Sequence, residues 1–365
     1  MKTFILSSIN PKNSHNNGNT LLSFFDKDKN YKYIYLRNDS NSKNIFNNKL
    51  KFGNLKSLLN LVYFPSLIIR FPIFNNKINK SDKVFFLVGD NISLMIYLLL
   101  FYKKKVRLSL YFTDNYFYNN NKFSNFFLYL FLKRIFKLNP DLYFINVKLK
   151  KSYSDIFINY FPRNTFILNY NYLKPQSTYV KSIHSTLNTI KTHNPKSVNI
   201  IYVGGLGIGR DSELLNLIQA NFNTNLHFHV ITTSKTNLHT ELIKLPNLHL
   251  YLNLKINEIA YFYEKADFFL HLENDDFYYV YKESLSTKLF EYLVYEKPIF
   301  LSIPQNTYTY DFLENMVIYI SKPYDSNKIL DLLNKTNTQK IQIFIQEFNK
   351  KQRAIHEKIL KRINY

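Results

Sequence analysis

The chain has 365 residues, of which 46% are hydrophobic, so it carries enough apolar material for two globular domains and is not a disordered protein. It contains no cysteine, which excludes a disulfide scaffold, a thiolate nucleophile and any cysteine-ligated zinc or iron–sulfur site. Of the formal net charge of +22, most lies in residues 1–180, which contain 27 Lys and Arg against 8 Asp and Glu. A basic half favours an anionic partner, namely nucleic acid, anionic lipid or a phosphorylated substrate, with a coding bias toward lysine as the alternative source of the charge.

Short apolar segments and helical segments alternate along the first half of the chain. The strands expected there are residues 3–6, 31–35, 84–88, 106–111, 142–147 and 165–168. The helices expected between them are residues 19–25, 91–103, 123–138 and 152–160. The longest apolar run, residues 92–102, is about half as long as the roughly 20 residues of a membrane span, so no transmembrane helix is expected.

The alternation is more regular in the second half. The strands expected there are residues 198–203, 226–231, 248–252, 268–272, 299–302 and 317–320. The helices expected are residues 211–220, 237–244, 256–265, 286–295, 326–333 and 339–363. Strand–helix alternation produces parallel sheets covered by helices on both faces, so we expect an α/β chain with two Rossmann-like domains. A polar stretch, residues 171–196, separates them at the position of the charge step.

Glycine is concentrated at one place in this glycine-poor chain. Four of the 7 glycines, Gly204, Gly205, Gly207 and Gly209, follow the strand 198–203 and precede Arg210 and a helix. Glycine lets a backbone approach a ligand closely, and a helix N-terminus offers free N–H groups to an anion. The pattern predicts a phosphate-binding loop, with an ordinary strand-to-helix turn as the alternative. Its spacing matches neither the dinucleotide fingerprint G-x-G-x-x-G nor the P-loop, whose Lys and hydroxyl are replaced by Arg210 and Asp211.

A second group of polar residues surrounds the start of the helix expected at 286–295. If Ser286 caps this helix, Lys288 lies in its first turn and Glu291 follows one turn later on the same face. Such a cation and carboxylate suit a sugar nucleotide, because the cation meets the diphosphate and the carboxylate accepts hydrogen bonds from ribose hydroxyls. A solvated Lys–Glu pair is the alternative.

The wider pattern resembles a known family. The run Ala266-Asp267-Phe268-Phe269-Leu270, then Glu283-x7-Glu291, then Lys297-Pro298-Ile299, resembles the donor domain of GT-B glycosyltransferases of the retaining, E-x7-E type. The resemblance covers about residues 198–333 and includes Tyr202-Val203-Gly204 with Arg210, and Pro246-Asn247-Leu248. It implies a GT-B fold, with two Rossmann-like domains whose parallel sheets face each other across a cleft. The expected parts are an acceptor-side domain 1–170, a linker 171–196, a donor domain 197–335 and a C-terminal helix 336–365 that packs back toward the first domain.

The resemblance also implies roles for single residues. Glu291 would hold the ribose, Arg210 and Lys288 the diphosphate, and Glu283, the catalytic candidate, the sugar hydroxyls. The remaining donor-binding candidates are Gly204, Gly205, Gly207, Gly209, Ser286 and Thr287. The acceptor-side candidates are Gly18, Asn19 and Thr20 in the first loop and Asp114 after the strand 106–111. The sequence departs from the family at Ser284-Leu285, where small residues are common, and at Ser212-Glu213, where a Lys often follows Arg210.

No metal ion or other cofactor is expected. Asp26-Lys27-Asp28 spells D-x-D but does not follow a long strand, and Asn274-Asp275-Asp276 is interpreted as a solvent-facing acidic loop. His227 and His229 alternate on a predicted strand without cysteines or clustered carboxylates, which disfavours a zinc site.

The function implied is transfer of a sugar from a nucleotide-sugar donor to a glycan or polyprenyl-diphosphate-linked acceptor in cell-surface polysaccharide biosynthesis. The apolar runs 92–102 and 126–131 adjoin lysines and arginine at 103–105 and 133–134, so binding to an anionic membrane surface is expected. The alternative is that these runs are core helices and that the lysines reflect the coding bias. The expected location is cytoplasmic and peripheral at the inner face of the membrane. The alternatives are a basic nucleic-acid-binding protein, disfavoured because the aromatic residues fall at buried strand positions, an epimerase that uses the same nucleotide, and an inactive glycosyltransferase-like subunit.

Overall fold

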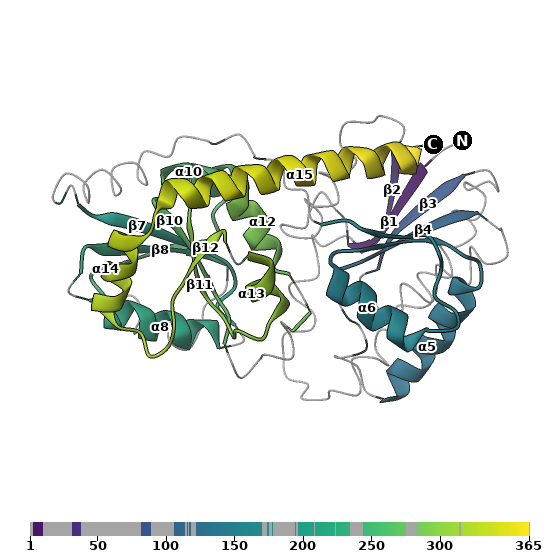
Figure 1. The fold of residues 1–365 in the computed structure, drawn as a ribbon, viewed down its shortest axis with the longest axis horizontal. Helices are drawn as coiled ribbons and strands as arrows, with labels where there is room; N and C mark the ends of the chain where they lie inside the picture. Colours follow the sequence, from purple (N-terminus) through teal and green to yellow (C-terminus); the bar gives the residue numbers. More distant parts are fainter. Residues whose placement is uncertain are drawn as a thin grey trace. The chain divides into compact units, whose positions relative to one another are not determined.

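The computed structural model describes residues 3–9, 31–37, 82–88, 106–113, 115, 117, 122–169, 174, 177, 194, 196–207, 209–222, 224–233, 244–274, 282–283, 285–313 and 315–364. The chain divides into two compact units, Met1–Tyr170 with Ile355–Tyr365, and Asn171–Ala354. Each unit is built around one parallel sheet (Figure 1).

The described strands of the first unit form a six-stranded sheet in the order β2-β1-β3-β4-β5-β6, with every neighbouring pair parallel. Its strands are β1 (Thr3–Ile9), β2 (Tyr31–Arg37), β3 (Lys83–Val88), β4 (Arg107–Phe112), β5 (Asp141–Phe144) and β6 (Thr165–Ile167). Helices α5 (Lys122–Phe136) and α6 (Val147–Ile156) lie on the same side of this sheet in Figure 1. The core between them is aromatic: the Phe112 ring lies 5.1 Å from that of Phe144 and 4.6 Å from that of Tyr153.

The second unit has a six-stranded sheet in the order β12-β11-β10-β7-β8-β9, and its neighbouring strands are also parallel. Its strands are β7 (Val198–Val203), β8 (Leu226–Thr232), β9 (Leu248–Leu252), β10 (Phe268–Leu272), β11 (Ile299–Ser302) and β12 (Val317–Tyr319). Its helices are α8 (Arg210–Ala220), α10 (Ile256–Lys265), α12 (Thr287–Leu293), α13 (Tyr308–Leu313), α14 (Ser326–Lys335) and α15 (Thr338–Asn364), the last of which runs into the part that groups with the first unit.

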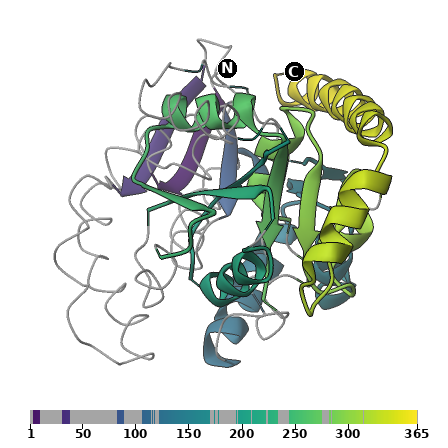
Figure 2. The ribbon, with the colours of Figure 1, turned by 90° about the vertical axis from the view of Figure 1, so that its left-hand side faces the viewer.

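Helices cover both faces of the second sheet. Apolar side chains of α8 and α14 pack on one face, and those of α10, α12, α13 and α15 pack on the other. Figures 1 and 2 show α8 and α10 on opposite sides of the strands. Because both faces are covered, β10 and β11 are buried at every residue, which explains why they are continuous apolar runs in the sequence rather than alternating ones.

Most elements of the second unit have the bounds that the sequence predicts. The elements with identical bounds are β7, β9, β10, β11 and α10. One helix was not predicted: α13 follows Thr307, whose hydroxyl lies 3.4 Å from the Tyr310 amide in the manner of a helix cap. The helices predicted at 19–25 and 91–103, and residues 237–243 of the helix predicted at 237–244, lie outside the described residues.

The prediction for residues 142–160 was wrong in its boundaries. The strand expected to reach residue 147 ends at Phe144, and the helix expected at 152–160 spans Val147–Ile156. The cause is Asn146, whose Oδ1 accepts a hydrogen bond from the Leu149 amide at 2.7 Å and so begins the helix five residues earlier. The apolar residues around Asn146 are typical of a strand, but the capping hydrogen bond of Asn146 outweighs this preference and starts a helix.

Candidate functional site

The strand order of the second sheet defines its binding edge. After β7 the chain builds β8 and β9 on one side, and it then returns to build β10, β11 and β12 on the other, so the order reverses between β7 and β10. In open parallel sheets, ligands bind beyond the carboxyl ends of the strands at such a switch point. Two predicted segments meet there: the glycines that follow β7, and the residues that follow β10.

The glycine loop has one position where glycine is required by its backbone. Gly209 has φ +71° at the N-cap position just before α8, and a Cβ there would lie 2.5 Å from Asn274 Nδ2. At Gly205 and Gly207 a Cβ would meet no atom within 4 Å, and neither glycine has a positive φ. Packing within the described residues therefore gives no reason for glycine at these two positions, which is the situation expected where a ligand approaches the backbone.

Arg210, the first residue of α8, is held by a carboxylate that the sequence analysis did not identify. Glu273 follows β10, and its Oε2 accepts from Arg210 Nη2 at 2.8 Å and from Nε at 3.1 Å. His271 Nε2 lies 3.0 Å from the other carboxylate oxygen. Burial alone would raise the pKa of Glu273, but His271 and Arg210 outweigh it and hold that pKa below its usual value. Glu273 is therefore ionised at neutral pH and fixes the direction of the guanidinium.

A second buried carboxylate lies behind the loop. Glu213, in the first turn of α8, accepts from Lys322 Nζ at 2.7 Å and from the Tyr324 hydroxyl at 3.0 Å. Asn274 Nδ2 lies 3.3 Å from both Glu213 Oε1 and the Gly209 carbonyl oxygen. The interpretation of Asn274 as solvent-facing was thus wrong: it is buried and ties β10 to the loop. Asp275 and Asp276 lie outside the described residues.

The residues predicted at the start of α12 are arranged as expected. Ser286 occupies the N-cap position, although its side chain makes no capping hydrogen bond, and Thr287 is the first helical residue. Lys288 Nζ donates to Glu291 Oε2 at 2.7 Å, which confirms that the two side chains share a face. The pair is not the solvated one of the alternative interpretation, because Glu291 is buried and also accepts from the Tyr263 hydroxyl at 2.9 Å.

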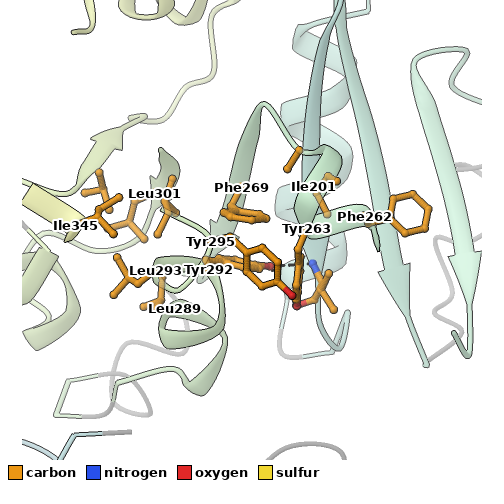
Figure 3. Close-up of a cluster of buried hydrophobic side chains, with 14 of the residues drawn as sticks. Ile201, Phe262, Tyr263, Phe269, Leu289, Tyr292, Leu293, Tyr295, Leu301 and Ile345 are labelled. Carbon is orange, nitrogen blue, oxygen red and sulfur yellow. Dashed lines mark hydrogen bonds between the residues drawn. The ribbon is translucent and has the colours of Figure 1, made fainter. Parts of the chain in front are cut away.

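A buried tyrosine connects α12 to the glycine loop. The Tyr292 hydroxyl accepts from the Val203 amide at 2.9 Å, at the last residue of β7 and directly before Gly204. Its ring stacks on Phe269 with centroids 4.5 Å apart, as Figure 3 shows. This hydrogen bond ties α12, the helix that carries Lys288 and Glu291, to the end of β7.

The remaining predicted site residues divide into two groups. Glu283 is described and buried, shortly before α12. Ser284 and all acceptor-side candidates, Gly18, Asn19, Thr20 and Asp114, lie outside the described residues, as do Asp26, Lys27 and Asp28.

The histidines of β8 form a stack with a third histidine from β9. The His229 ring lies 4.7 Å from that of His249, whose Nε2 is 3.4 Å from His227 Nδ1. His229 is fully buried between Asn199 and Tyr251. Burial lowers the pKa of all three imidazoles: that of His249 falls to about 4, also because of His227, and that of His229 falls well below the usual value. Within the described part of the chain, no group of three or more His, Asp or Glu side chains is arranged to hold a metal ion.

Comparison with known proteins places the fold. No protein-family model and no curated protein matches the chain. Among solved structures, Anabaena HepE in complex with UDP is 11% identical, with 100% of both chains covered and a TM-score of 0.66. WaaG, a glycosyltransferase of lipopolysaccharide biosynthesis, is 11% identical over 99% of both chains, with a TM-score of 0.56. The UDP-GlcNAc 2-epimerase of Methanocaldococcus jannaschii is 12% identical over 93% of this chain and 94% of its own, with a TM-score of 0.53.

These similarities confirm the predicted fold class: the chain is an α/β protein with two parallel sheets and has the GT-B fold of the glycosyltransferases that it matches. In the parts of the chain that the structure describes, no helix is both long enough and apolar enough to span a bilayer.

Proposed function

We propose that this protein is a glycosyltransferase that moves a sugar from a nucleotide-sugar donor to a glycan or lipid-linked acceptor, in cell-surface polysaccharide biosynthesis. The observation that carries the proposal is the cluster at the β7–β10 switch point of the second unit. The glycine loop and Arg210 follow β7 there, α12 with its Lys288–Glu291 pair is joined to the end of β7 through Tyr292, and the fold is shared with enzymes crystallised with UDP and UDP-glucose.

Each part of this cluster has a chemical role in the proposal. The exposed amides of Gly205 and Gly207 donate to no acceptor among the described residues, so they offer hydrogen bonds to a diphosphate. Arg210 and Lys288 supply positive charge to the leaving diphosphate. Glu291 accepts hydrogen bonds from the ribose, and Glu283 contacts the transferred sugar, whose anomeric configuration is retained, as the resemblance to retaining GT-B glycosyltransferases implies.

The proposed division of labour follows the sequence boundaries. Residues 1–170 bind the acceptor, residues 197–335 bind the donor, 171–196 link the two, and the helix within 336–365 ends in residues that group with the first unit. Gly18, Asn19, Thr20 and Asp114 remain the candidates on the acceptor side. The protein needs no bound cofactor in this scheme, because dipoles and cations of the protein stabilise the leaving group.

An epimerase is the alternative within the same fold, since UDP-GlcNAc 2-epimerases are among the similar structures. The glycosyltransferase is favoured because HepE and a glycosyltransferase from Rickettsia africae have TM-scores of 0.66 and 0.61, against 0.56 and 0.53 for the two epimerases. A nucleic-acid binder is disfavoured by the burial of the largest aromatic side chains in the described strands, which leaves them unable to stack on bases.

Donor binding is tested by thermal shift with UDP, GDP, ADP, CMP and their sugars, because a bound ligand raises stability by mass action. Lys288→Ala and Glu291→Ala should each weaken binding about ten- to a hundredfold, since a charge-assisted hydrogen bond contributes about 1.5–3 kcal/mol. Lys335→Ala is the matched control, because Lys335 forms a comparable ion pair with Asp331, at 2.6 Å, on the exposed surface of α14. The assignment of the donor site is wrong if no nucleotide raises the unfolding temperature of the parent protein.

Turnover separates the remaining possibilities. Incubation with the stabilising sugar nucleotide and a membrane glycolipid extract should release free nucleoside diphosphate and extend the acceptor. An epimerase would instead change the stereochemistry of the sugar, and an inactive subunit would leave the sugar nucleotide intact.

We further propose that the first unit binds an anionic membrane surface, which gives a cytoplasmic and peripheral location. The support is one face of α5, where Phe126, Phe127 and Leu130 are 57%, 40% and 38% exposed and the exposed Arg134 and Lys137 follow. Aromatic and aliphatic side chains beside basic ones are typical of helices that lie in a membrane interface. Each nearby cation contributes about 1 kcal/mol toward anionic lipid. The apolar run 92–102 and Lys103–Lys105 lie outside the described residues.

Vesicle flotation of the full chain tests this surface. Recovery with phosphatidylglycerol vesicles should exceed that with phosphatidylcholine, fall with salt, and fall again in the variant Phe126→Ser/Phe127→Ser. Ile158→Ser is the matched control, because Ile158 is also apolar and exposed in the first unit but lies beyond the end of α6. Equal recovery with both lipids would show that the α5 residues do not form a membrane site.

A further inference from the structure

The carboxylate of Glu291 is held through a single oxygen atom. Its Oε2 accepts from the Tyr263 hydroxyl at 2.9 Å and from Lys288 Nζ at 2.7 Å. Among the described residues, no side chain or amide donates to the other oxygen, Oε1. One oxygen of this carboxylate is therefore hydrogen-bonded to the protein, and the second oxygen points in a fixed direction.

The two donors differ in rigidity. Lys288 has a long, flexible side chain that is partly exposed, whereas Tyr263 is fully buried on α10. The Tyr263 ring makes edge-to-face contacts with Phe269 at 5.4 Å, Tyr292 at 5.7 Å and Tyr295 at 5.0 Å. Figure 3 shows this cluster, from which Tyr263 projects its hydroxyl. Because the ring cannot turn without displacing three aromatic neighbours, the position of its hydroxyl is fixed by the core rather than by the site.

We propose that Tyr263 is a positioning residue that makes the donor site select ribonucleotides over 2′-deoxyribonucleotides. It holds Oε2 of Glu291 so that Oε1 points at the ribose hydroxyls, an inference that rests on the proposed role of Glu291. A carboxylate already oriented by a buried hydroxyl loses little conformational freedom when it accepts a hydrogen bond from a ribose hydroxyl. The full free energy of that hydrogen bond therefore adds to the difference in affinity between the ribonucleotide and its 2′-deoxy analogue. A site built to accept from a hydroxyl rejects the analogue that lacks it, since the buried acceptor is then left unpaired.

The structure supplies a closely matched pair of variants. Tyr263→Phe removes only the hydroxyl that contacts Glu291. Tyr295→Phe removes a hydroxyl from a neighbouring buried ring of the same cluster, and this hydroxyl has no hydrogen-bond partner among the described residues. Both changes keep the packing of the aromatic rings, so they separate the hydrogen bond to Glu291 from general effects on the core.

The experiment measures dissociation constants by calorimetry for three pairs of probes: UDP and 2′-deoxy-UDP, GDP and 2′-deoxy-GDP, and ADP and 2′-deoxy-ADP. For the pair that the parent binds, we expect a preference of about ten- to a hundredfold for the ribonucleotide. Tyr263→Phe should reduce this preference to about threefold or less, mainly by weakening the binding of the ribonucleotide. Tyr295→Phe should leave the preference unchanged. The ratio of the two constants does not depend on the fraction of folded protein, so partial unfolding of a variant cannot produce this result.

The possible failures are distinguishable. If the parent prefers the ribonucleotide and Tyr263→Phe keeps that preference, the role of Tyr263 is overturned and the proposed function stands. A parallel loss of preference in Tyr295→Phe would also overturn it, because the effect would then come from the core. If the parent binds the ribonucleotide and its 2′-deoxy analogue equally, the ribose role of Glu291 fails. If it binds none of these probes and no nucleotide or sugar nucleotide stabilises it in the thermal-shift screen, the proposed function fails as well.

Discussion

The stacked histidines of β8 and β9 predict an acid-sensitive second unit. The test lowers the pH from 7.5 to 5 and compares the parent protein with the variant His249→Phe. The phenylalanine keeps an aromatic ring in the stack but cannot bind a proton. His249 has a pKa of about 4 in the folded protein, against 6.5 for an unperturbed imidazole. Because the folded pKa is the lower one, the unfolded chain binds the extra proton first. The stability that comes from the neutral His249 is therefore fully present above pH 6.5 and is lost as the pH falls toward 4.

The magnitude follows from the same two values. At pH 5 the difference in proton binding at His249 alone corresponds to about 2 kcal/mol. The ring is partly accessible, and solvent screening reduces this to about 1 kcal/mol, or about 2–4 °C in the midpoint of thermal unfolding for a unit of this size. The buried His229 changes in the same direction, since its pKa is also lowered. The pKa of Glu273 is held below its usual value, so the stabilising contribution of this carboxylate is lost mainly below the pH range of this comparison.

The assay is thermal unfolding followed by circular dichroism at several pH values for both proteins. The midpoint of the parent should fall by about 2–4 °C more than that of His249→Phe between pH 7.5 and pH 5. The imidazole resonance that disappears from the NMR spectrum of the variant should titrate near pH 4 in the parent. A difference in midpoint that does not change with pH, or a resonance that titrates above pH 6, would refute the reasoning.

Four further substitutions test the packing of the site by urea unfolding. Gly209→Ala should lower the free energy of unfolding by more than about 2 kcal/mol, because the new side chain is strained at a positive φ and clashes with Asn274. Gly207→Ala should change the free energy of unfolding by less than about 0.5 kcal/mol and still weaken nucleotide binding. Glu213→Leu removes the buried carboxylate that contacts Lys322 and Tyr324 and should cost about 2–4 kcal/mol. A stability equal to that of the parent would show that this network does not hold the loop. Tyr292→Phe removes the acceptor of the last amide of β7 and should cost about 1–2 kcal/mol; no change would mean that water replaces the hydroxyl.

Local signals in the sequence were sufficient for the elements of the second unit and for part of the site. The strands β7, β10 and β11 are apolar runs bounded by polar residues or proline, and a strand buried on both faces needs no other feature. The edge strand β9 is half-buried, and its leucines alternate with His249 and Tyr251. The pairing of Lys288 with Glu291 was also predictable, since residues three apart on a helix are neighbours whatever the rest of the chain does. The same holds for the glycine loop, whose glycines lie within six positions.

What the sequence could not determine are contacts between residues far apart in the chain. Glu273 meets Arg210 across 63 residues and Tyr263 meets Glu291 across 28, because the sheet order makes β10 a neighbour of β7 and because α10 and α12 pack on one face. His249 joins the histidines of β8 only through the register of β8 with β9, which pairs His229 with His249. Strand order and register are properties of the assembled sheet, since they depend on how all its apolar faces are buried together. A carboxylate such as Glu273, which looks in the sequence like one acidic residue in an acidic loop, therefore acquires its role only when the sheet has formed.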